Sequence, residues 1–313
     1  MNRRSLLALP ALLAARPAGA QPDRLPVVAS FSILGDMVTQ IAGDRVALRV
    51  IAGPDVDAHG FQPRPSDVAA LRQAQVVVRN GLGFDAWMDR LVRAAGFRGP
   101  VATATDGITP RAMAADAHDH GVTGRRRSHS LGPNSVPDPH AWQDLRLGQV
   151  YLRNITAALV AADPDGEATY RRNAEAFASR LAALDAWVRA QVATVPGNRR
   201  RVVTSHDAFG YFAAAYGIEF LSPQGVSTEA EPSAAEVARL IRLMREQNIT
   251  AIFMENMTNP ATLRRIAAEI GVPVGGRLYA DALSAPGGPA ATYEAMFRHN
   301  IGLLVPAMRA GAA

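Results

Sequence analysis

The chain has 313 residues, of which 48% are hydrophobic and 19% charged, and it contains seven histidines and no cysteine. This composition excludes an intrinsically disordered chain, disulfide scaffolds, thiolate zinc sites, iron–sulfur clusters and cysteine nucleophiles, and the length suits two lobes. The formal charge is +5, but all 33 basic residues are arginines spread along the chain, with one dense run at 125–127, so we expect no nucleic-acid binding.

The first twenty residues have the pattern of a secretory signal peptide. An arginine pair precedes a short apolar run over 6–15, and the small residues at 18–20 fit the cleavage rule. The alternative is an ordinary buried helix, since the run is too short to span a bilayer. We predict a soluble protein exported to the periplasm by the Sec or twin-arginine route and cleaved after about Ala20, with the formal charge lowered to +2. No cysteine follows the apolar run, so we expect no lipid anchor.

Between residues 27 and 103, short β-rich runs alternate with helical stretches. The predicted strands cover 27–31, 46–51, 75–79 and 101–103, and the predicted helices cover 33–42, 66–73 and 84–95. Such alternation is typical of parallel β-α-β units. The stretch 114–139 is rich in His, Gly, Pro and Arg, and we predict a long surface loop there. We assign 21–163 to an N-terminal α/β lobe.

A long helix is predicted in the middle of the chain. It follows a helix over 145–162 and covers 164–196, where apolar residues recur every three or four positions. These apolar residues are Tyr170, Ala174, Phe177, Leu181, Leu184, Val188 and Val192. At 1.5 Å per residue the helix would be about 45 Å long, which suits a connection between two lobes.

The remaining residues, 197–313, repeat the alternation and form a predicted C-terminal α/β lobe. The predicted strands cover 201–204, 218–221, 249–254 and 272–274, and the predicted helices cover 209–216, 233–247, 259–270 and 292–308. The two lobes therefore have similar layouts.

Three histidines and one aspartate are candidate metal ligands. His59 and His206 each follow a predicted strand, as Asp281 does, and ligands of open α/β sheets bind beyond the carboxyl ends of strands. His140 lies at the start of a predicted helix. Three imidazoles and one carboxylate would suit Zn²⁺, although imidazole also suits copper, iron and nickel. The spacing has no local signature such as HExxH, so the residues alone leave ordinary loop histidines equally open.

The residues around these four positions resemble the motifs of the periplasmic zinc- and manganese-binding solute-binding proteins of bacterial ABC transporters, the ZnuA- or TroA-like (cluster A-I) family. The four matching segments are 57–63, 138–142, 205–211 and 278–284, and Asp-Pro-His-Ala-Trp at 138–142 is the most specific of them. The motifs occur in the family's order. The resemblance covers 27 to about 310, which is essentially the whole mature chain.

This resemblance implies an α/β fold with two (β/α)4 lobes of parallel sheet, one long rigid connecting helix and a metal site in the cleft between the lobes. The implied ligands are His59, His140, His206 and Asp281. Manganese-binding relatives usually carry Glu at the third position and zinc-binding relatives His, so His206 favours zinc. The implied protein is not an enzyme. It is a high-affinity Zn²⁺ receptor, which we expect to be monomeric, and it delivers the ion to an ABC permease in the inner membrane.

Three alternatives stay open. They are a manganese receptor of the same family, a zinc hydrolase with an open fourth position, and a purely structural metal site. The hydrolase is disfavoured because the chain has neither an HExxH motif nor a Gly-x-Ser-x-Gly elbow.

The sequence assigns no ligand role to the other four histidines, and it offers three carboxylates as possible orienting groups. The loop holds His118, His120 and His129 with three arginines between them, so it is either a solvated loop or a transient zinc-capture segment. Three carboxylates could orient the histidine rings, and the sequence does not rank them: Asp57, Asp207 and Glu255. His299 matches no ligand motif and is predicted to be a surface or capping residue.

Overall fold

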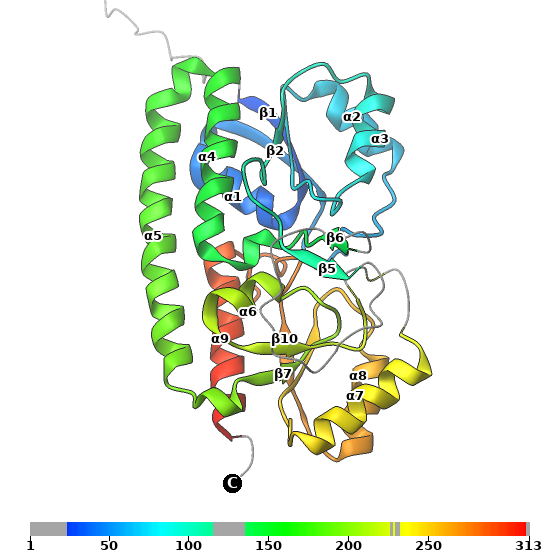
Figure 1. Ribbon diagram of the computed structural model, residues 1–313. Coiled ribbons are helices and arrows are strands. Elements are labelled where there is room, and N and C mark those ends of the chain that lie inside the picture. The colour runs from blue at the N-terminus through cyan, green and yellow to red at the C-terminus, as the bar shows by residue number, and fades with distance from the viewer. Residues whose placement is uncertain (1–23, 115–134, 226–227, 229–231, 311–313) are drawn as a thin grey trace, which may run out of the picture.

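A computed structural model of the chain describes residues 24–114, 135–225, 228 and 232–310. The predicted signal peptide and the loop histidines His118, His120 and His129 lie outside the described residues. Two α/β lobes are stacked, and a long helix runs along one side of both (Figure 1). This arrangement confirms the predicted fold class.

The N-terminal lobe is built on a parallel four-stranded sheet with the strand order β2-β1-β3-β4. The strands are β1 (Leu25–Phe31), β2 (Val46–Ala52), β3 (Val76–Arg79) and β4 (Val101–Thr103). The helices are α1 (Ser32–Ala42), α2 (Pro65–Gln73), α3 (Trp87–Ala95) and α4 (Leu145–Ala162). The central strands β1 and β3 are almost wholly buried, which explains why they are continuous apolar runs rather than alternating patterns.

The C-terminal lobe repeats this topology. Its strands are β7 (Arg201–Val203), β8 (Glu219–Leu221), β9 (Ile252–Glu255) and β10 (Val274–Leu278), all parallel and in the order β10-β9-β7-β8. Its helices are α6 (Gly210–Tyr216), α7 (Ala234–Glu246), α8 (Ala261–Ile270) and α9 (Tyr293–Ala310). In each lobe the first strand of the sequence therefore lies between the second and the third. The similar layout predicted for the two lobes is confirmed.

The connecting helix is α5 (Glu167–Ala193), which is about 40 Å long. Residues Pro164–Gly166, which we predicted to begin this helix, instead form a 3₁₀ turn, and the α-helix ends three residues before Pro196. The predicted apolar stripe is buried except for Ala174, which is half-buried. It packs into one hydrophobic core that is continuous through both lobes, so α5 ties them together.

Several other local predictions were wrong at their boundaries; for example, the strand predicted over 249–254 begins at Ile252. The ends of the predicted loop over 114–139 join a short antiparallel pair of strands, β5 (Ala112–Ala114) and β6 (Ser135–Pro137). The helix α3 begins at Trp87 instead of Phe84, because Asp85 accepts the backbone N–H groups of Asn80 and Gly81 and holds a loop there. The last strand continues four residues beyond Val274 because it pairs with β9.

Within the residues that the structure describes, no helix is both long and apolar enough to cross a membrane.

Candidate metal centre

The four predicted ligands lie on four separate loops that meet between the lobes. His59 follows β2 by seven residues, and His140 immediately precedes a 3₁₀ turn over Ala141–Gln143. His206 follows β7 and Asp281 follows β10, each by three residues. Both sheets are parallel, so their strands end at the same edge, and the fold brings together side chains that are far apart in the sequence.

The ligand atoms of these four side chains all lie within 4.8 Å of one another. Oδ2 of Asp281 lies 3.1 Å from Nε2 of His59 and 3.0 Å from Nε2 of His206. Nε2 of His140 lies 3.3 Å from Nε2 of His59 and 3.7 Å from Oδ1 of Asp281. Three imidazole nitrogens therefore converge on one carboxylate.

His140 is oriented by Asp138, two residues before it. Oδ1 of Asp138 accepts hydrogen bonds from the backbone N–H of His140 at 3.0 Å and from its Nδ1 at 2.9 Å. Both side chains are fully buried. A proton on Nδ1 leaves the lone pair of Nε2 facing the centre, as a metal ligand requires.

His206 is oriented by Glu255, the last residue of β9. Oε2 of Glu255 lies 2.5 Å from Nδ1 of His206, and Oε1 accepts the backbone N–H groups of Ser205 and His206 at 2.8 and 3.1 Å. The carboxylate thus fixes both the ring and the loop that carries it, and Nε2 of His206 again points to the centre.

His59 has a different support. Its backbone N–H donates to Oδ1 of Asp57 at 2.9 Å, and its ring packs edge-on against Phe84. Its side chain is 8% exposed, whereas those of His140, His206 and Asp281 are 0% exposed. His59 is therefore the most solvent-accessible of the four candidate ligands.

Asp281 is positioned from the opposite lobe. The indole N–H of Trp142 and the side-chain amide of Gln143 both donate to the carbonyl of Ala280, at 2.9 and 2.8 Å. Trp142 and Gln143 lie two and three residues after His140, so one short segment both supplies a candidate ligand and fixes the loop that carries another.

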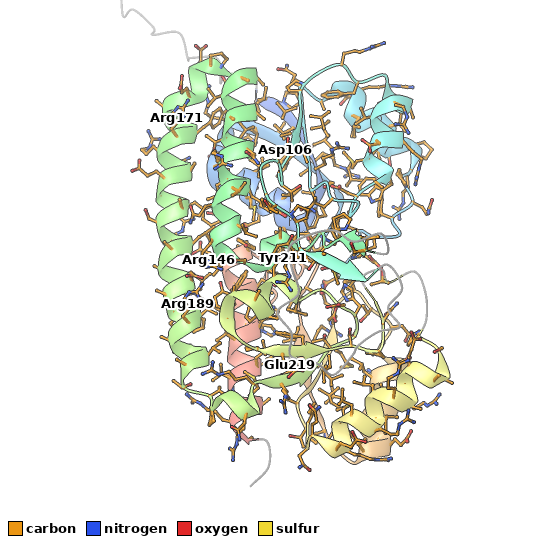
Figure 2. The ribbon with its side chains drawn as sticks, in the orientation of Figure 1. Asp106, Arg146, Arg171, Arg189, Tyr211 and Glu219 are labelled. Atoms are coloured by element: carbon orange, nitrogen blue, oxygen red, sulfur yellow. The ribbon has the colours of Figure 1, made fainter. Side chains whose placement is uncertain are left out.

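Tyr211 adds a second bridge between the lobes. Its hydroxyl donates to the carbonyl of Asp138 at 3.2 Å and accepts the backbone N–H of Arg111 at 3.0 Å. It lies at the level where the two lobes meet (Figure 2). The segment around Asp138 is therefore held by both lobes.

The electrostatics of the centre follow from burial and close charges. Burial lowers the pKa of His59 below its ordinary value, so this ring is neutral at neutral pH. Burial also acts to lower the pKa of His206, but the Glu255 and Asp281 carboxylates outweigh it and raise that pKa well above the usual range. Burial acts to raise the pKa of Asp281, but His140 and His206 outweigh it and hold that pKa well below the usual range. Asp281 is therefore an anion facing three nitrogen donors.

This donor set fits a divalent transition metal. Three imidazole nitrogens and one carboxylate are a common tetrahedral set, and an ion placed among them would satisfy all four. Oδ1 of Asp281 is buried without a hydrogen-bond partner among the described residues, which leaves a carboxylate oxygen available. An unpartnered buried carboxylate oxygen is costly, and a cation would remove that cost.

The orienting residues were only partly predicted. Of the three carboxylates that the sequence left unranked, Glu255 contacts His206, Asp57 holds the backbone of His59, and Asp207 donates its backbone N–H to the Gly225 carbonyl. Asp138 was missed as an orienting group, although the signal was in the sequence. Both Asp-x-His segments, at 57–59 and 138–140, place a carboxylate where it accepts the histidine's own N–H.

His299 lies away from the centre on α9. Its Nε2 lies 2.8 Å from the carbonyl oxygen of Arg277, and its ring contacts Tyr279 edge-on. Among the described residues, His59, His140, His206 and Asp281 are the only group of side chains close enough together to share a metal ion. The prediction that His299 is not a ligand agrees with this position.

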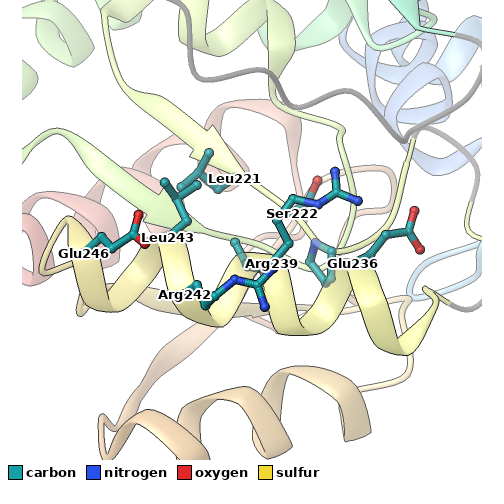
Figure 3. A pocket seen from close by; sticks show the side chains of 9 residues that line it. Leu221, Ser222, Glu236, Arg239, Arg242, Leu243 and Glu246 are labelled. Carbon is teal, nitrogen blue, oxygen red and sulfur yellow. The ribbon is translucent and has the colours of Figure 1, made fainter.

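A separate groove lies on the outer side of the C-terminal lobe, beside α7 (Figure 3). Leu221 and Leu243 line it, with the charged side chains of Arg242 and Glu246 along α7. All of its lining residues fall within 221–246, so this groove shares no residue with the candidate metal centre.

Comparison with known proteins shows what the chain is similar to. A family model described as zinc-uptake complex component A, periplasmic, matches residues 27–307. Among curated proteins, the manganese-binding lipoprotein MntA of Halalkalibacterium halodurans is 32% identical, over 90% of this chain and 88% of its own. The iron-binding protein YfeA of Yersinia pestis is 30% identical, over 95% and 90%. The metal ABC transporter substrate-binding lipoprotein SsaB of Streptococcus sanguinis is 27% identical, over 91% and 89%.

Solved structures with a similar fold are also periplasmic metal-binding proteins. The periplasmic zinc-binding protein TroA from Treponema pallidum superposes with a TM-score of 0.81 at 29% identity, over 91% of this chain and 99% of that one. A manganese-bound periplasmic metal-binding protein from Candidatus Liberibacter asiaticus superposes with a TM-score of 0.76 at 28% identity, over 91% and 100%. The names of these similar proteins include manganese, iron and zinc.

Proposed function

Because this chain belongs to the family of the periplasmic zinc-uptake complex component A, we propose that it captures Zn²⁺ with high affinity and hands it to an ABC permease for import. As a member of this family, the chain is the metal-binding receptor of an ABC uptake system and not an enzyme. The choice of zinc, the four ligands and the handover to an inner-membrane permease are the proposal.

One observation carries the choice of ligands. Four buried or nearly buried side chains bring three imidazole nitrogens and a carboxylate within 4.8 Å of one another, and two of the rings have Nδ1 at hydrogen-bonding or ion-pair distance from a carboxylate. Ligating histidines are typically oriented in this way, because a carboxylate at Nδ1 fixes the ring and strengthens Nε2 as a donor. We therefore assign His59, His140, His206 and Asp281 as the ligands.

The donor set supports zinc over manganese. Manganese favours oxygen-rich sites, whereas this centre offers three nitrogens and a single carboxylate. The manganese-binding alternative keeps its support from relatives named for manganese, such as the MntA lipoprotein. The zinc hydrolase has less support, because it needs a fourth position open to water and Asp281 lies 3.0–3.1 Å from two of the three ligand nitrogens.

A competition titration tests this proposal. The purified mature chain should bind one Zn²⁺ per molecule and hold it against an excess of Mn²⁺. Zinc at a hundred times its dissociation constant should stabilise the fold by about 2.7 kcal/mol, and His140→Ala should abolish the corresponding rise in melting temperature. Tighter binding of manganese than of zinc would replace the zinc assignment with the manganese alternative.

A further inference from the structure

One carboxylate joins a proposed ligand to the opposite lobe. Asp57 lies on the loop after β2 in the N-terminal lobe, and its Oδ2 accepts a 2.5 Å hydrogen bond from Oγ1 of Thr228, in the C-terminal lobe. Its other oxygen, Oδ1, accepts the backbone N–H of His59 at 2.9 Å. The backbone position of His59 is thus fixed through Asp57 by a hydroxyl from across the cleft.

This bond lies beside a polar cavity next to the metal centre. The cavity has a volume of about 80 Å³ and is lined by Asp57 and Thr228 together with Ser205 and Thr258. Ser205 directly precedes His206, and its hydroxyl and that of Thr258 are buried without hydrogen-bond partners among the described residues. A water needs a cavity volume of about 10–15 Å³, so this cavity can hold several waters that would satisfy these hydroxyls.

The cavity and the partly exposed side chain of His59 together indicate where water could replace a ligand on the bound ion. His59 is the only proposed ligand with any exposed side-chain surface, and the carboxylate that holds it also lines the cavity. Water that reaches His59 can replace its nitrogen on the ion, which is the first step of release. A ring held rigidly by its backbone leaves the ion less often than a ring on a mobile loop.

Resting on the proposed function, we propose that Thr228 is a positioning residue that slows metal release: its hydrogen bond to Asp57 holds the loop of His59 against the C-terminal lobe. Within the described residues, the hydrogen bond that links Thr228 to a proposed ligand runs through Asp57, so Thr228 is expected to act on His59 indirectly. The same loop keeps another attachment when this bond is removed, because the backbone N–H of Asp55 donates to the Leu283 carbonyl at 2.9 Å and its carboxylate accepts from Asn256. Loss of the bond should therefore loosen the loop without opening the lobes.

The experiment measures zinc release from the loaded protein into excess chelator by stopped flow. Thr228→Val keeps the shape and removes the donor, and we expect about a tenfold faster release, the effect of one hydrogen bond to a charged acceptor. Thr228→Ser restores the hydroxyl and should return the rate to that of the wild type. The control is Thr250→Val, the same change two residues before β9 begins and so beyond the strand end opposite to Glu255, and its rate should stay unchanged.

A double variant tests whether both residues act through one bond. Thr228→Val combined with Asp57→Asn should release zinc no faster than Asp57→Asn alone. Equal rates for Thr228→Val and the wild type, or a serine variant as fast as the valine variant, would overturn the role of Thr228. A wild-type chain that binds no zinc would overturn the proposed function as well, whereas normal stoichiometry with an unchanged release rate would overturn only this inference.

Discussion

Oε2 of Glu255 lies 2.5 Å from Nδ1 of His206, while Oε1 of the same carboxylate accepts the backbone N–H groups of Ser205 and His206. One buried side chain at the end of β9 therefore holds both the ring and the loop of a proposed ligand. Its negative charge would also help to compensate the charge of an ion bound at Nε2 of His206.

Replacement of Glu255 should weaken zinc binding without removing a ligand. Glu255→Gln keeps the shape but loses the negative charge at Nδ1, and we expect zinc affinity to fall by about 10- to 100-fold, the usual effect of losing such a partner. Isothermal titration with a competing chelator measures this change. Glu246→Gln, the same substitution on the exposed side of α7, is the control and should bind zinc normally. An affinity within twofold of the wild type for Glu255→Gln would contradict the role of this carboxylate.

Zinc binding should release a proton at neutral pH. Glu255 and Asp281 raise the pKa of His206 well above the usual range, so the metal-free ring is protonated at pH 7 and the ion must displace that proton. The ion pairs of protonated His206 with Glu255 and Asp281 stabilise the metal-free fold. This stabilisation has its full value at a pH below the ordinary histidine pKa of about 6.5, and it is lost as the pH rises through the raised pKa of His206. Zinc affinity should therefore increase with pH across this range.

Titration in weak buffer with a pH indicator measures the released proton. His59 should contribute none, because burial lowers its pKa and its ring is already neutral. Glu255→Gln should release less than the wild type, since the charge that raises the pKa of His206 is gone. A zinc affinity that stays constant between pH 6 and 8 would contradict this prediction.

The convergence of the proposed ligands could be predicted from the sequence better than the residues that orient them. His59, His206 and Asp281 were predictable because each follows a β-rich run, and parallel strands present their carboxyl ends at one edge of a sheet. The orienting role of Glu255 could not be ranked from the sequence, because it depends on where β9 ends relative to a loop about 50 residues away in the chain. The orienting role of Asp138 could have been predicted, because an aspartate two residues before a histidine can accept that histidine's backbone N–H.

Two of the boundary errors also come from contacts that are distant in the sequence. The strand β10 includes Gly275 and Gly276, which have low strand propensity, and Gly276 has a φ of +130°, yet pairing with β9 extends the strand through them. The strands β5 and β6 are three residues each and have no alternating pattern long enough to detect. In both cases, pairing with a strand that is distant in the sequence determines where the strand begins and ends.

Gly210 is a position where one methyl group should disturb the metal centre from the opposite lobe. A Cβ there would lie 2.7 Å from Oδ2 of Asp138, the carboxylate that orients His140. Gly210→Ala should displace that carboxylate, so we expect weaker zinc binding and a loss of about 1–3 kcal/mol of stability, as in other overpacked sites.

The control for this change is Gly302→Ala on α9, where nothing lies within 4 Å of the added Cβ. It should leave zinc binding unchanged and stabilise the helix by about 0.5–1 kcal/mol, because alanine favours helix over glycine. Urea unfolding and zinc titration of both variants measure the two effects. Normal zinc affinity in Gly210→Ala would show that Asp138 tolerates displacement and does not set the position of His140.

The residue at position 206 should set the choice of metal. His206→Glu replaces a nitrogen donor by a carboxylate, which favours a harder cation, so the ratio of zinc to manganese affinity should move toward manganese by about tenfold, or about 1.4 kcal/mol. The variant places a third carboxylate between Glu255 and Asp281, so its metal-free form should unfold at a lower temperature and regain stability when an ion binds. His299→Glu is the matched control, because that histidine contacts Arg277 and Tyr279 and not the centre. Competition titrations of the three proteins with both ions measure the ratio, and an unchanged ratio in His206→Glu would show that metal choice depends on the geometry of the centre instead of on this donor.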